Sequence, residues 1–353
     1  MSRTVIAWAA TSPHELEPMT IERREPDEND VSIDIKFAGI CHSDLHTVKG
    51  EWAKTEYPLV PGHEISGIVT SIGRNVRKFK IGDRVGVGCM VNSCRTCHNC
   101  TEGEEQYCLK GPVWTYNTRD PKEGKITQGG YSQHIVVDQS YVLRIPDGIA
   151  LDVAAPLLCA GITVYSPLKH WGIGPGKKIG VIGLGGLGHM AVKIGKALGA
   201  EVTVFSQTLS KKDLGLKMGA DHYYATGDPS VLRGLKRSLD LIINTVSATI
   251  PVTLYLSVLR RDGTLVEVGM PPEPLSIVPF ALASQRVGVY GSNIGGIRET
   301  QEMLDFCGDK NVFPVIETIP ASYINEAYER MMKSQVQFRF VIDISSMESR
   351  PRL

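Results

Sequence analysis

Apolar and polar residues alternate along much of the first 150 positions. The run over residues 31–37 (Val-Ser-Ile-Asp-Ile-Lys-Phe) has a period of two, which is typical of a strand with one buried face. Short apolar runs at 65–72, 84–87 and 135–137 continue the pattern. Glycine, asparagine and aspartate stand between these runs, where tight turns are expected. This part of the chain therefore predicts irregular β structure.

The pattern changes after about residue 150. Residues 177–182 predict a short apolar strand that leads into a cluster of glycines, and residues 187–198 then have helical spacing. A second strand at 201–205 and a second helix at 210–218 follow. Regular alternation of strand and helix is typical of a doubly wound parallel sheet, so we expect an α/β domain here.

The tail of the chain breaks this alternation. Helical patterns at 299–307 and 324–332 are followed by a strand pattern at 338–344. We therefore expect the tail to return to the first domain. The predicted organisation is a β-rich domain, an α/β domain, and a return segment that completes the first domain, over residues 1–154, 155–296 and 297–353.

The composition is that of an ordinary globular protein, with 42% apolar and 22% charged residues. Lysine and arginine balance aspartate and glutamate at 38 each, so no net field favours nucleic acid or a membrane as partner. The N-terminus lacks the long apolar region of a signal peptide, and no apolar stretch is expected to reach the ~20 residues of a membrane helix. We expect a cytoplasmic protein, in which the eight cysteines are metal ligands rather than disulfides.

Four of these cysteines fall within 15 residues: Cys94, Cys97, Cys100 and Cys108. Two-residue gaps let one loop wrap around a tetrahedral ion, and four thiolates leave no open position, so a zinc ion here would be structural. Free or oxidised thiols and an iron–sulfur cluster are the alternatives. A nucleic-acid zinc ribbon is disfavoured because the acidic stretch 101–105 would repel phosphate.

A glycine motif of the form G-x-G-x-x-G lies between the first strand and the first helix of the α/β domain. This position makes the motif a dinucleotide fingerprint, in which the glycines allow a tight turn, close approach of the pyrophosphate, and close packing of helix on strand. The helix N-terminus offers free N–H groups to the phosphates. The residues concerned are Gly183, Leu184, Gly185, Gly186, Leu187 and Gly188.

The end of the next strand indicates which dinucleotide binds. An NAD site usually carries a carboxylate there, whereas this chain has Ser206, followed by Gln207 and Thr208. A carboxylate ~4 Å from a 2′-phosphate would cost up to ~4 kcal/mol at an effective dielectric near 20, and a hydroxyl removes that penalty. Lys211 and Lys212 would attract the phosphate, with an exposed helix start as the alternative. We therefore predict NADP(H).

Cys41, His63 and Cys159 are candidate ligands of a second metal ion. Two sulfurs and one imidazole leave a fourth position open for water or substrate, which is the catalytic type of zinc site. Taken singly, a cysteine or histidine is more often part of the core than a ligand. The spacing of these three residues does not show that they converge.

Several motifs occur in the order and spacing of a known family. They are the segments 39–46 (GICHSDLH), 61–64 (PGHE), 129–131 and 158–161, the four-cysteine cluster, the glycine motif and the segment 291–296. With them the chain resembles zinc-containing medium-chain dehydrogenases, and above all their cinnamyl-alcohol-dehydrogenase-like, NADP-linked branch. The resemblance covers essentially the whole chain. It implies a GroES-like catalytic domain and a Rossmann cofactor domain.

The resemblance also implies roles for the candidate metal ligands. Cys41, His63 and Cys159 would bind the catalytic zinc, the ligand set for which alcohol dehydrogenase is the known example. Glu64 would lie behind the ion as an occasional ligand, and Asp44 would orient His63. For both carboxylates, a solvated position in a turn is the alternative.

Ser43 and His46 resemble the proton relay of the family. Trp52, Trp114 and Tyr116 match aromatic residues of the substrate pocket, with domain core or oligomer contacts as the alternative. If they line the pocket, medium apolar or aromatic primary alcohols and aldehydes fit better than polyols. Cysteine at position 159 also disfavours the polyol branch, which typically has glutamate there.

Further residues match positions that contact the cofactor in the family. Thr163 would pack on the nicotinamide ring, and loops with Val268, Gly269, Ser292, Asn293 and Ile294 would line it. Thr245 and Val246 would also bind the cofactor. Arg339 would reach the pyrophosphate, with an exposed arginine as the alternative.

The activity that follows is hydride transfer between a primary alcohol or aldehyde and NADP(H), with two zinc ions per chain. A zinc-free quinone reductase of the same superfamily would lack both cysteine constellations, and a catalytically silent binding protein would have no reason to keep the ligands and the relay. The resemblance suggests a homodimer, or a tetramer. Cys89 and Cys307 receive no role.

Overall fold

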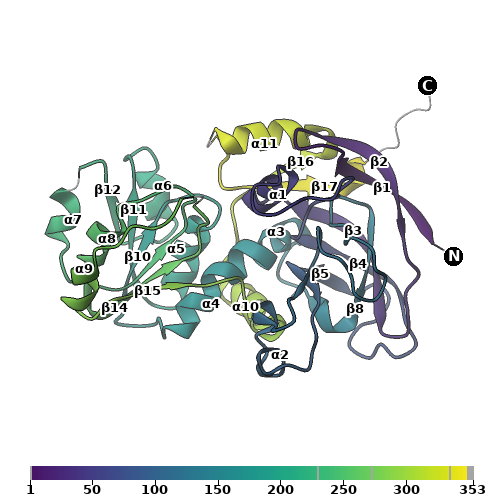
Figure 1. The fold of residues 1–353 in the computed structure, drawn as a ribbon, viewed down its shortest axis with the longest axis horizontal. Coiled ribbons are helices and arrows are strands. Elements are labelled where there is room, and N and C mark those ends of the chain that lie inside the picture. The colour runs from purple at the N-terminus through teal and green to yellow at the C-terminus, as the bar shows by residue number, and fades with distance from the viewer. Residues whose placement is uncertain (1, 229, 272, 334, 348–353) are drawn as a thin grey trace. The chain divides into compact units, whose positions relative to one another are not determined.

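The computed structural model describes residues 2–347, apart from 229, 272 and 334 (Figure 1). The chain forms two compact units, one made of Met1–Cys159 with Gly295–Leu353, the other of Ala160–Ile294. The tail therefore returns to the first unit. The first boundary falls at Cys159 rather than at residue 154. Helical structure runs through it without a polar or glycine-rich break, over α3 (Leu151–Pro156), the π-turn η3 (Leu157–Gly161) and α4 (Ile162–His170).

A seven-stranded sheet is the frame of the first unit among the described residues. Its path is β16-β17-β3-β4-β5-β9, and β8 pairs with β3. The strands are β16 (Ile316–Pro320), β17 (Arg339–Asp343), β3 (Asp30–Gly39), β4 (Ile65–Ile72), β5 (Arg84–Val87), β9 (Leu143–Arg144) and β8 (His134–Asp138). Strand β17 pairs antiparallel with β3, so the tail supplies a neighbour to one of the first strands of the chain.

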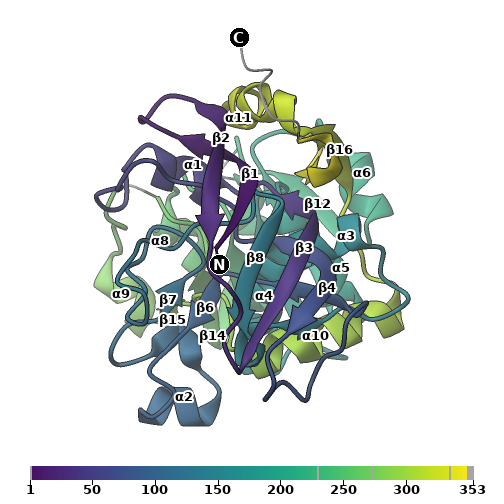
Figure 2. The same ribbon diagram turned by 90° about the vertical axis from the view of Figure 1, so that its right-hand side faces the viewer.

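Smaller elements surround this sheet. An antiparallel hairpin, drawn in purple near the N-terminus in Figure 2, is formed by β1 (Arg3–Ala10) and β2 (Leu16–Arg23). The four-cysteine lobe lies between the paired strands β6 (Met90–Asn92) and β7 (Val113–Trp114), and contains α2 (His98–Glu102) and η1 (Glu105–Tyr107). The other helical elements are α1 (His42–Val48), η2 (Gln139–Tyr141), α10 (Ile297–Lys310), η4 (Ala321–Tyr323), α11 (Ile324–Met332) and η5 (Ile344–Ser346).

The second unit is a six-stranded, fully parallel sheet in the order β12-β11-β10-β13-β14-β15. The strands are β10 (Lys178–Ile182), β11 (Glu201–Ser206), β12 (His222–Ala225), β13 (Leu239–Asn244), β14 (Leu259–Glu267) and β15 (Gly288–Gly291). The helices are α5 (Gly188–Ala197), α6 (Lys212–Lys217), α7 (Ser230–Gly234), α8 (Val252–Leu256) and α9 (Pro279–Ala283). The first strand of the unit, β10, lies between the second and the fourth. The strand order reverses there, which is where doubly wound sheets bind their ligands.

The expectation that no apolar stretch reaches the length of a membrane helix is wrong for one helix. The helix over Leu151–His170 has 20 residues and a mean hydropathy of 1.4, so by length and composition it is able to cross a membrane. It is one such helix within the part of the chain that the structure describes. Of the most apolar part of this helix, 78% is buried inside the protein, which is typical of a core helix. Its length and composition are therefore weak evidence that it crosses a membrane.

Candidate active site

The first unit brings Cys41, His63, Glu64 and Cys159 together. Their ligand atoms all lie within 4.8 Å of one another, and all four residues are buried. Cys41 is the N-cap of α1 at the end of β3, the pair 63–64 directly precedes β4, and Cys159 lies in η3. The Sγ atoms of Cys41 and Cys159 are 3.9 Å apart. The convergence that the spacing alone did not show is therefore present in the fold.

This cluster fits a zinc ion by its donors. Two thiols, an imidazole and a carboxylate match the ligands that Zn²⁺ takes in proteins. Glu64 Oε2 is a buried oxygen without a hydrogen-bond partner, and a side chain at position 39 would overlap it, so Gly39 leaves the carboxylate its space. Burial raises the pKa of Glu64 to about 8, although the neighbouring Arg339 guanidinium lowers it. A cation beside Oε2 would satisfy an oxygen that the protein leaves unpaired.

Asp44 holds the ligand segments in place. Its carboxylate is fully buried and accepts hydrogen bonds from the backbone N–H groups of Cys41 (2.8 Å) and Gly62 (3.1 Å) and from the hydroxyl of Tyr131 (3.0 Å). The fourth contact is with His63 Nδ1, at 3.1 Å. A solvated turn position is therefore wrong for Asp44, as it is for the fully buried Glu64. A carboxylate on the second nitrogen of a ligating histidine fixes its tautomer and orientation.

The predicted relay residues lie on α1, directly after Cys41. Ser43 Oγ is 3.5 Å from Cys41 Sγ. His46 stacks on Trp52, with 4.8 Å between ring centroids, and its Nδ1 is 2.5 Å from the Glu51 carboxylate. Glu51 is not among the residues that the sequence motifs indicated. The signal that points to it is Gly50, whose φ of +69° turns the chain so that Glu51 N bonds back to the His46 carbonyl.

The three aromatic candidates differ in position. Trp52 is 49% exposed and covers the His46 ring, whereas Tyr116 is buried, with its hydroxyl 3.2 Å from His63 Nδ1. Trp114 lies half-buried in β7, opposite Met90. Trp52 and Tyr116 thus flank the relay and the metal cluster respectively, while a pocket role for all three remains a prediction.

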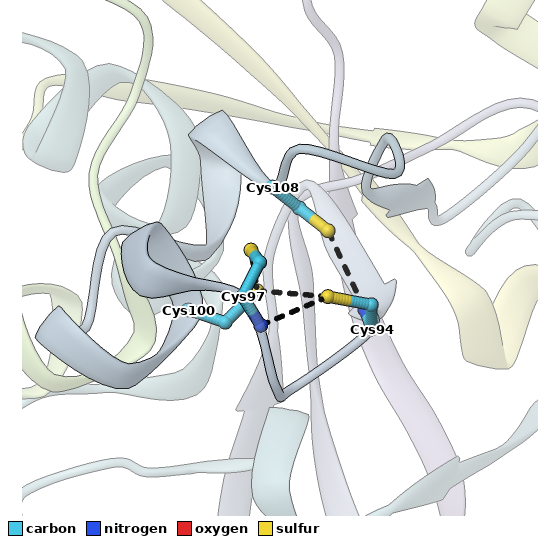
Figure 3. Close-up of side chains that lie close together, drawn as sticks. All are labelled: Cys94, Cys97, Cys100 and Cys108. Carbon is cyan, nitrogen blue, oxygen red and sulfur yellow. Dashed lines mark hydrogen bonds between the residues drawn. The ribbon is translucent and has the colours of Figure 1, made fainter.

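The four-cysteine cluster also assembles. The four Sγ atoms lie within 4.8 Å of one another, and Figure 3 shows the side chains gathered around one space. Backbone N–H groups donate to the sulfurs: Cys97 N to Cys94, Leu109 N to Cys97, and Cys94 N to Cys108, each at 3.4 Å. N–H donors from Thr96 and Cys97 lower the pKa of Cys94 to about 6, which favours thiolate. This donor set fits a closed tetrahedral zinc site.

The glycine motif has the geometry that a phosphate-binding turn requires. Gly183 has φ +89°, a conformation that strongly favours glycine. A Cβ at Gly188 would overlap the Gly183 carbonyl oxygen, so helix α5 can begin this close to β10 only without a side chain. A Cβ at Gly185 would meet nothing within 4 Å, which leaves open space above the backbone. These features fit the approach of a pyrophosphate.

The residues after β11 lie beside this turn. Ser206 ends the strand half-buried, and Gln207 and Thr208 are exposed. Lys211 Nζ donates to the carbonyl oxygen of Leu184, within the glycine motif, at 3.3 Å. Lys211 therefore reaches the glycine turn. Lys212 is exposed at the start of α6, as the alternative for the two lysines expected.

The other cofactor candidates of this unit, apart from Thr163 on α4, follow the carboxyl ends of strands. Those ends meet at one edge of a parallel sheet. Thr245 Oγ1 donates to Ile182 O (2.7 Å), and Gly269 N donates to Asn244 O (3.0 Å). Such bonds join neighbouring strand ends. The loops concerned hold Thr245 and Val246, Val268 and Gly269, and Ser292, Asn293 and Ile294.

Arg339 is buried in the first unit. It is 3% exposed, so the exposed alternative is wrong, and its guanidinium is hydrogen-bonded to Glu64 behind the metal cluster. Contact with a pyrophosphate remains a prediction. The reason for the difference is that β17 lies beside β3 in the first unit, which brings position 339 close to the start of β4.

Two protein families match the chain. Residues 27–147 match the alcohol dehydrogenase GroES-like domain, and residues 186–309 match the zinc-binding dehydrogenase family. The NADP-dependent alcohol dehydrogenase C of Mycobacterium bovis is 59% identical over 98% of this chain and 99% of that protein. A probable mannitol dehydrogenase of Medicago sativa is 51% identical over 96% of this chain and 94% of that protein.

A solved structure agrees with these matches. It is the cinnamyl alcohol dehydrogenase of Helicobacter pylori complexed with NADP(H), which has a TM-score of 0.92 and 44% identity and covers 99% of this chain and 100% of that one. The chain therefore belongs to the zinc-binding, medium-chain alcohol dehydrogenases. Within them it lies in the cinnamyl-alcohol-dehydrogenase-like branch. The GroES-like and Rossmann domains expected from the sequence are confirmed.

The two clusters predict the metal content of the protein. We expect two zinc ions per chain in the purified protein and one in Cys159→Ala, because that change removes a thiolate from the open site and leaves the four-cysteine site intact. Elemental analysis after dialysis measures this. The matched control is Cys307→Ala, a buried cysteine beside Met303, which should keep both ions. Two ions in Cys159→Ala would contradict the assignment.

Proposed function

We propose that the protein transfers hydride between primary alcohols or aldehydes and NADP(H) at the zinc site formed by Cys41, His63 and Cys159. The observation that carries this proposal is the convergence of these three side chains, with Ser43 next to Cys41 and the His46–Glu51 pair on the segment that follows. The names of the Mycobacterium bovis and Helicobacter pylori relatives support the cofactor and the reaction class.

The metal and the cofactor supply the chemistry that side chains lack. Zinc held by these donors would polarise an alcohol or carbonyl oxygen, and NADP(H) would accept or donate the hydride. The protein's part begins with Ser43, whose Oγ lies beside the ligand Cys41 and can hold a proton. His46 Nδ1 is engaged by the Glu51 carboxylate, which fixes the proton on Nδ1 and leaves Nε2 as the acceptor. The half-exposed Glu51 offers the proton a route to water.

This role of Glu51 can be tested by Glu51→Gln. We expect kcat for alcohol oxidation to fall about tenfold, because a neutral amide no longer stabilises the protonated imidazole during the transfer. KM for NADP⁺ should not change. Steady-state rates at several pH values measure both quantities.

Glu56→Gln is the matched control, since Glu56 is an exposed carboxylate of the same loop, paired with Arg119. An unchanged kcat in Glu51→Gln, or an equal loss in both variants, would count against the relay.

The preference for NADP(H) rests on Ser206 and Lys211. The hydroxyl at the end of β11 avoids the repulsion that a carboxylate would exert on a 2′-phosphate. Lys211 is anchored to the Leu184 carbonyl, so its ammonium group stays next to the glycine turn. A positive charge held there favours an additional phosphate.

An absorbance assay tests the activity and the cofactor together. We expect wild-type protein to oxidise NADPH with an aromatic aldehyde such as benzaldehyde, and to use NADH at least tenfold less well in kcat/KM. In Ser206→Asp, kcat/KM for NADPH should fall at least tenfold, since ~1.4 kcal/mol of repulsion corresponds to a factor of ten. NADH should then be used as well as or better than before.

Ser210→Asp is the control, because it adds the same charge to an exposed position four residues further on. No turnover with either cofactor in zinc-loaded wild type would sink the proposed activity. Equal use of NADH and NADPH by wild type would overturn the cofactor preference alone.

A polyol is the second candidate substrate class, because the Medicago sativa relative carries the name of a mannitol dehydrogenase. The same assay in the oxidative direction, with mannitol beside benzyl alcohol, separates the two classes. We favour the aromatic or apolar alcohol because Trp52 and Tyr116 lie at the relay and at the metal cluster.

The oligomeric state we propose is a homodimer formed by the second unit. Strand β15 is an edge strand that carries the exposed Tyr290 (54%), and the same unit has further exposed apolar side chains: Met270 (48%), Val278 (54%) and Phe280 (77%). Exposed apolar side chains beside an open sheet edge are typical of an interface. Sedimentation should give two chains per particle, and Phe280→Asp should shift the particle toward one chain. A single chain in wild type would contradict the dimer.

We also propose a cytoplasmic location. All eight cysteines are free, which supports a reducing compartment.

A further inference from the structure

Helix α10 begins where the chain passes from one unit to the other. Ile294 is the last residue of the second unit and Gly295 the first of the returning segment. The N-cap of the helix is Gly296, which has no side chain to accept hydrogen bonds from the first turn. The free N–H groups of this turn therefore need acceptors from another part of the protein.

The four-cysteine lobe supplies one of these acceptors and a second contact to the same turn. Ile297 N donates to Glu105 Oε2 at 3.0 Å, and the Arg298 guanidinium donates to the carbonyl oxygen of Glu102 at 2.8 Å. The contact is close, because a Cβ on Gly296 would overlap both the Gly103 carbonyl oxygen and Glu105 Oε2. Glu105 thus caps α10 from a segment almost 200 residues earlier in the chain.

The capped segment directly follows the predicted nicotinamide loop. Ile294 has φ +39°, which is rare for a β-branched residue and persists only where the surroundings hold it. On one side, Ser292 N donates to the Glu267 carbonyl at the end of β14. On the other side, Ile297 N is bonded to Glu105. The start of the loop is therefore bonded within the second unit, and the residue after its end is bonded within the first.

We propose that Glu105 is a positioning residue for the cofactor. By capping α10, it holds the loop 292–296 in the conformation that receives the nicotinamide ring. Glu105 lies in η1, between Cys100 and Cys108, so the structural metal would hold the loop through this residue as well as stabilise its own lobe. The inference rests on the proposed function, because it assumes that the loop binds NADP(H).

The variant Glu105→Ala tests the cap. Loss of a helix cap corresponds to about a fivefold change in a local equilibrium, so amide exchange over residues 295–300 should become about fivefold faster in the cofactor-free protein. The Kd for NADPH, from fluorescence titration, should rise by at most the same factor of about five, because a smaller fraction of the loop is competent to bind. The value of kcat at saturating NADPH should be unchanged, a split that a general loss of structure would not give.

Three further variants decide the interpretation. Glu105→Gln keeps an acceptor oxygen and should restore exchange and Kd. Glu102→Ala removes an exposed carboxylate from the same lobe but keeps the carbonyl that Arg298 contacts, so it should behave as wild type. Arg298→Gln weakens the contact between Arg298 and the Glu102 carbonyl and changes no residue of the lobe. It should make exchange faster and raise the Kd for NADPH, as Glu105→Ala does. It therefore serves as the test if Glu105→Ala loses zinc.

The proposal would be overturned if amides 295–300 exchanged at the wild-type rate in both Glu105→Ala and Arg298→Gln. It would also be overturned if Glu102→Ala and Glu105→Ala changed the exchange rate and the Kd equally. Faster exchange with an unchanged Kd for NADPH would also overturn it, since the cap would then serve stability alone. Failure of the proposed function is distinguishable, because wild-type protein would then not bind NADPH, whereas the exchange measurement needs no cofactor.

Discussion

The buried carboxylate of Asp44 is the contact on which the metal site depends. It receives N–H groups from the segments of both Cys41 and His63, and it contacts the imidazole itself. The hydroxyl of Tyr131 completes its hydrogen bonding. A buried carboxylate is costly unless such partners surround it, so the segments must converge for the fold to be stable. The same bonds that satisfy the charge therefore place the ligands, and binding of the metal does not have to supply the arrangement.

Much of the fold could be predicted from the sequence because local pattern and tertiary position agree. Strand β4 and helix α11 have the bounds that the periodicity predicts, and the glycine motif lies between strand and helix as its spacing requires. The pattern does not reveal the hairpin β1–β2, because β1 carries an unbroken apolar run over residues 5–10 that shows no period, and polar residues and Pro18 interrupt β2. The helix through Leu151–His170 was missed because it is buried on most sides, so its sequence lacks an amphipathic period.

The site was predictable where a family motif carries it and not where tertiary contacts create it. Resemblance pointed to Cys41, His63 and Cys159, whereas neither pattern nor spacing indicated that Glu51 would meet His46 or that Arg339 would pair with Glu64. The Glu51 contact depends on one glycine turn. The Arg339 contact depends on the pairing of the first and last parts of the chain in one sheet, which a single sequence does not reveal.

The return of the tail has a consequence for how the protein forms during synthesis. The second unit is one continuous stretch, so all its strands are available once about residue 294 has left the ribosome. The first unit cannot complete its sheet until β17 emerges and pairs with β3. Until then, the edge of β3 that later faces β17 is uncovered, and Glu64 lacks its guanidinium partner. Because domains generally fold as units and the N-terminal part usually folds first, this chain reverses the ordinary order of maturation. Its catalytic half, begun first, is completed last.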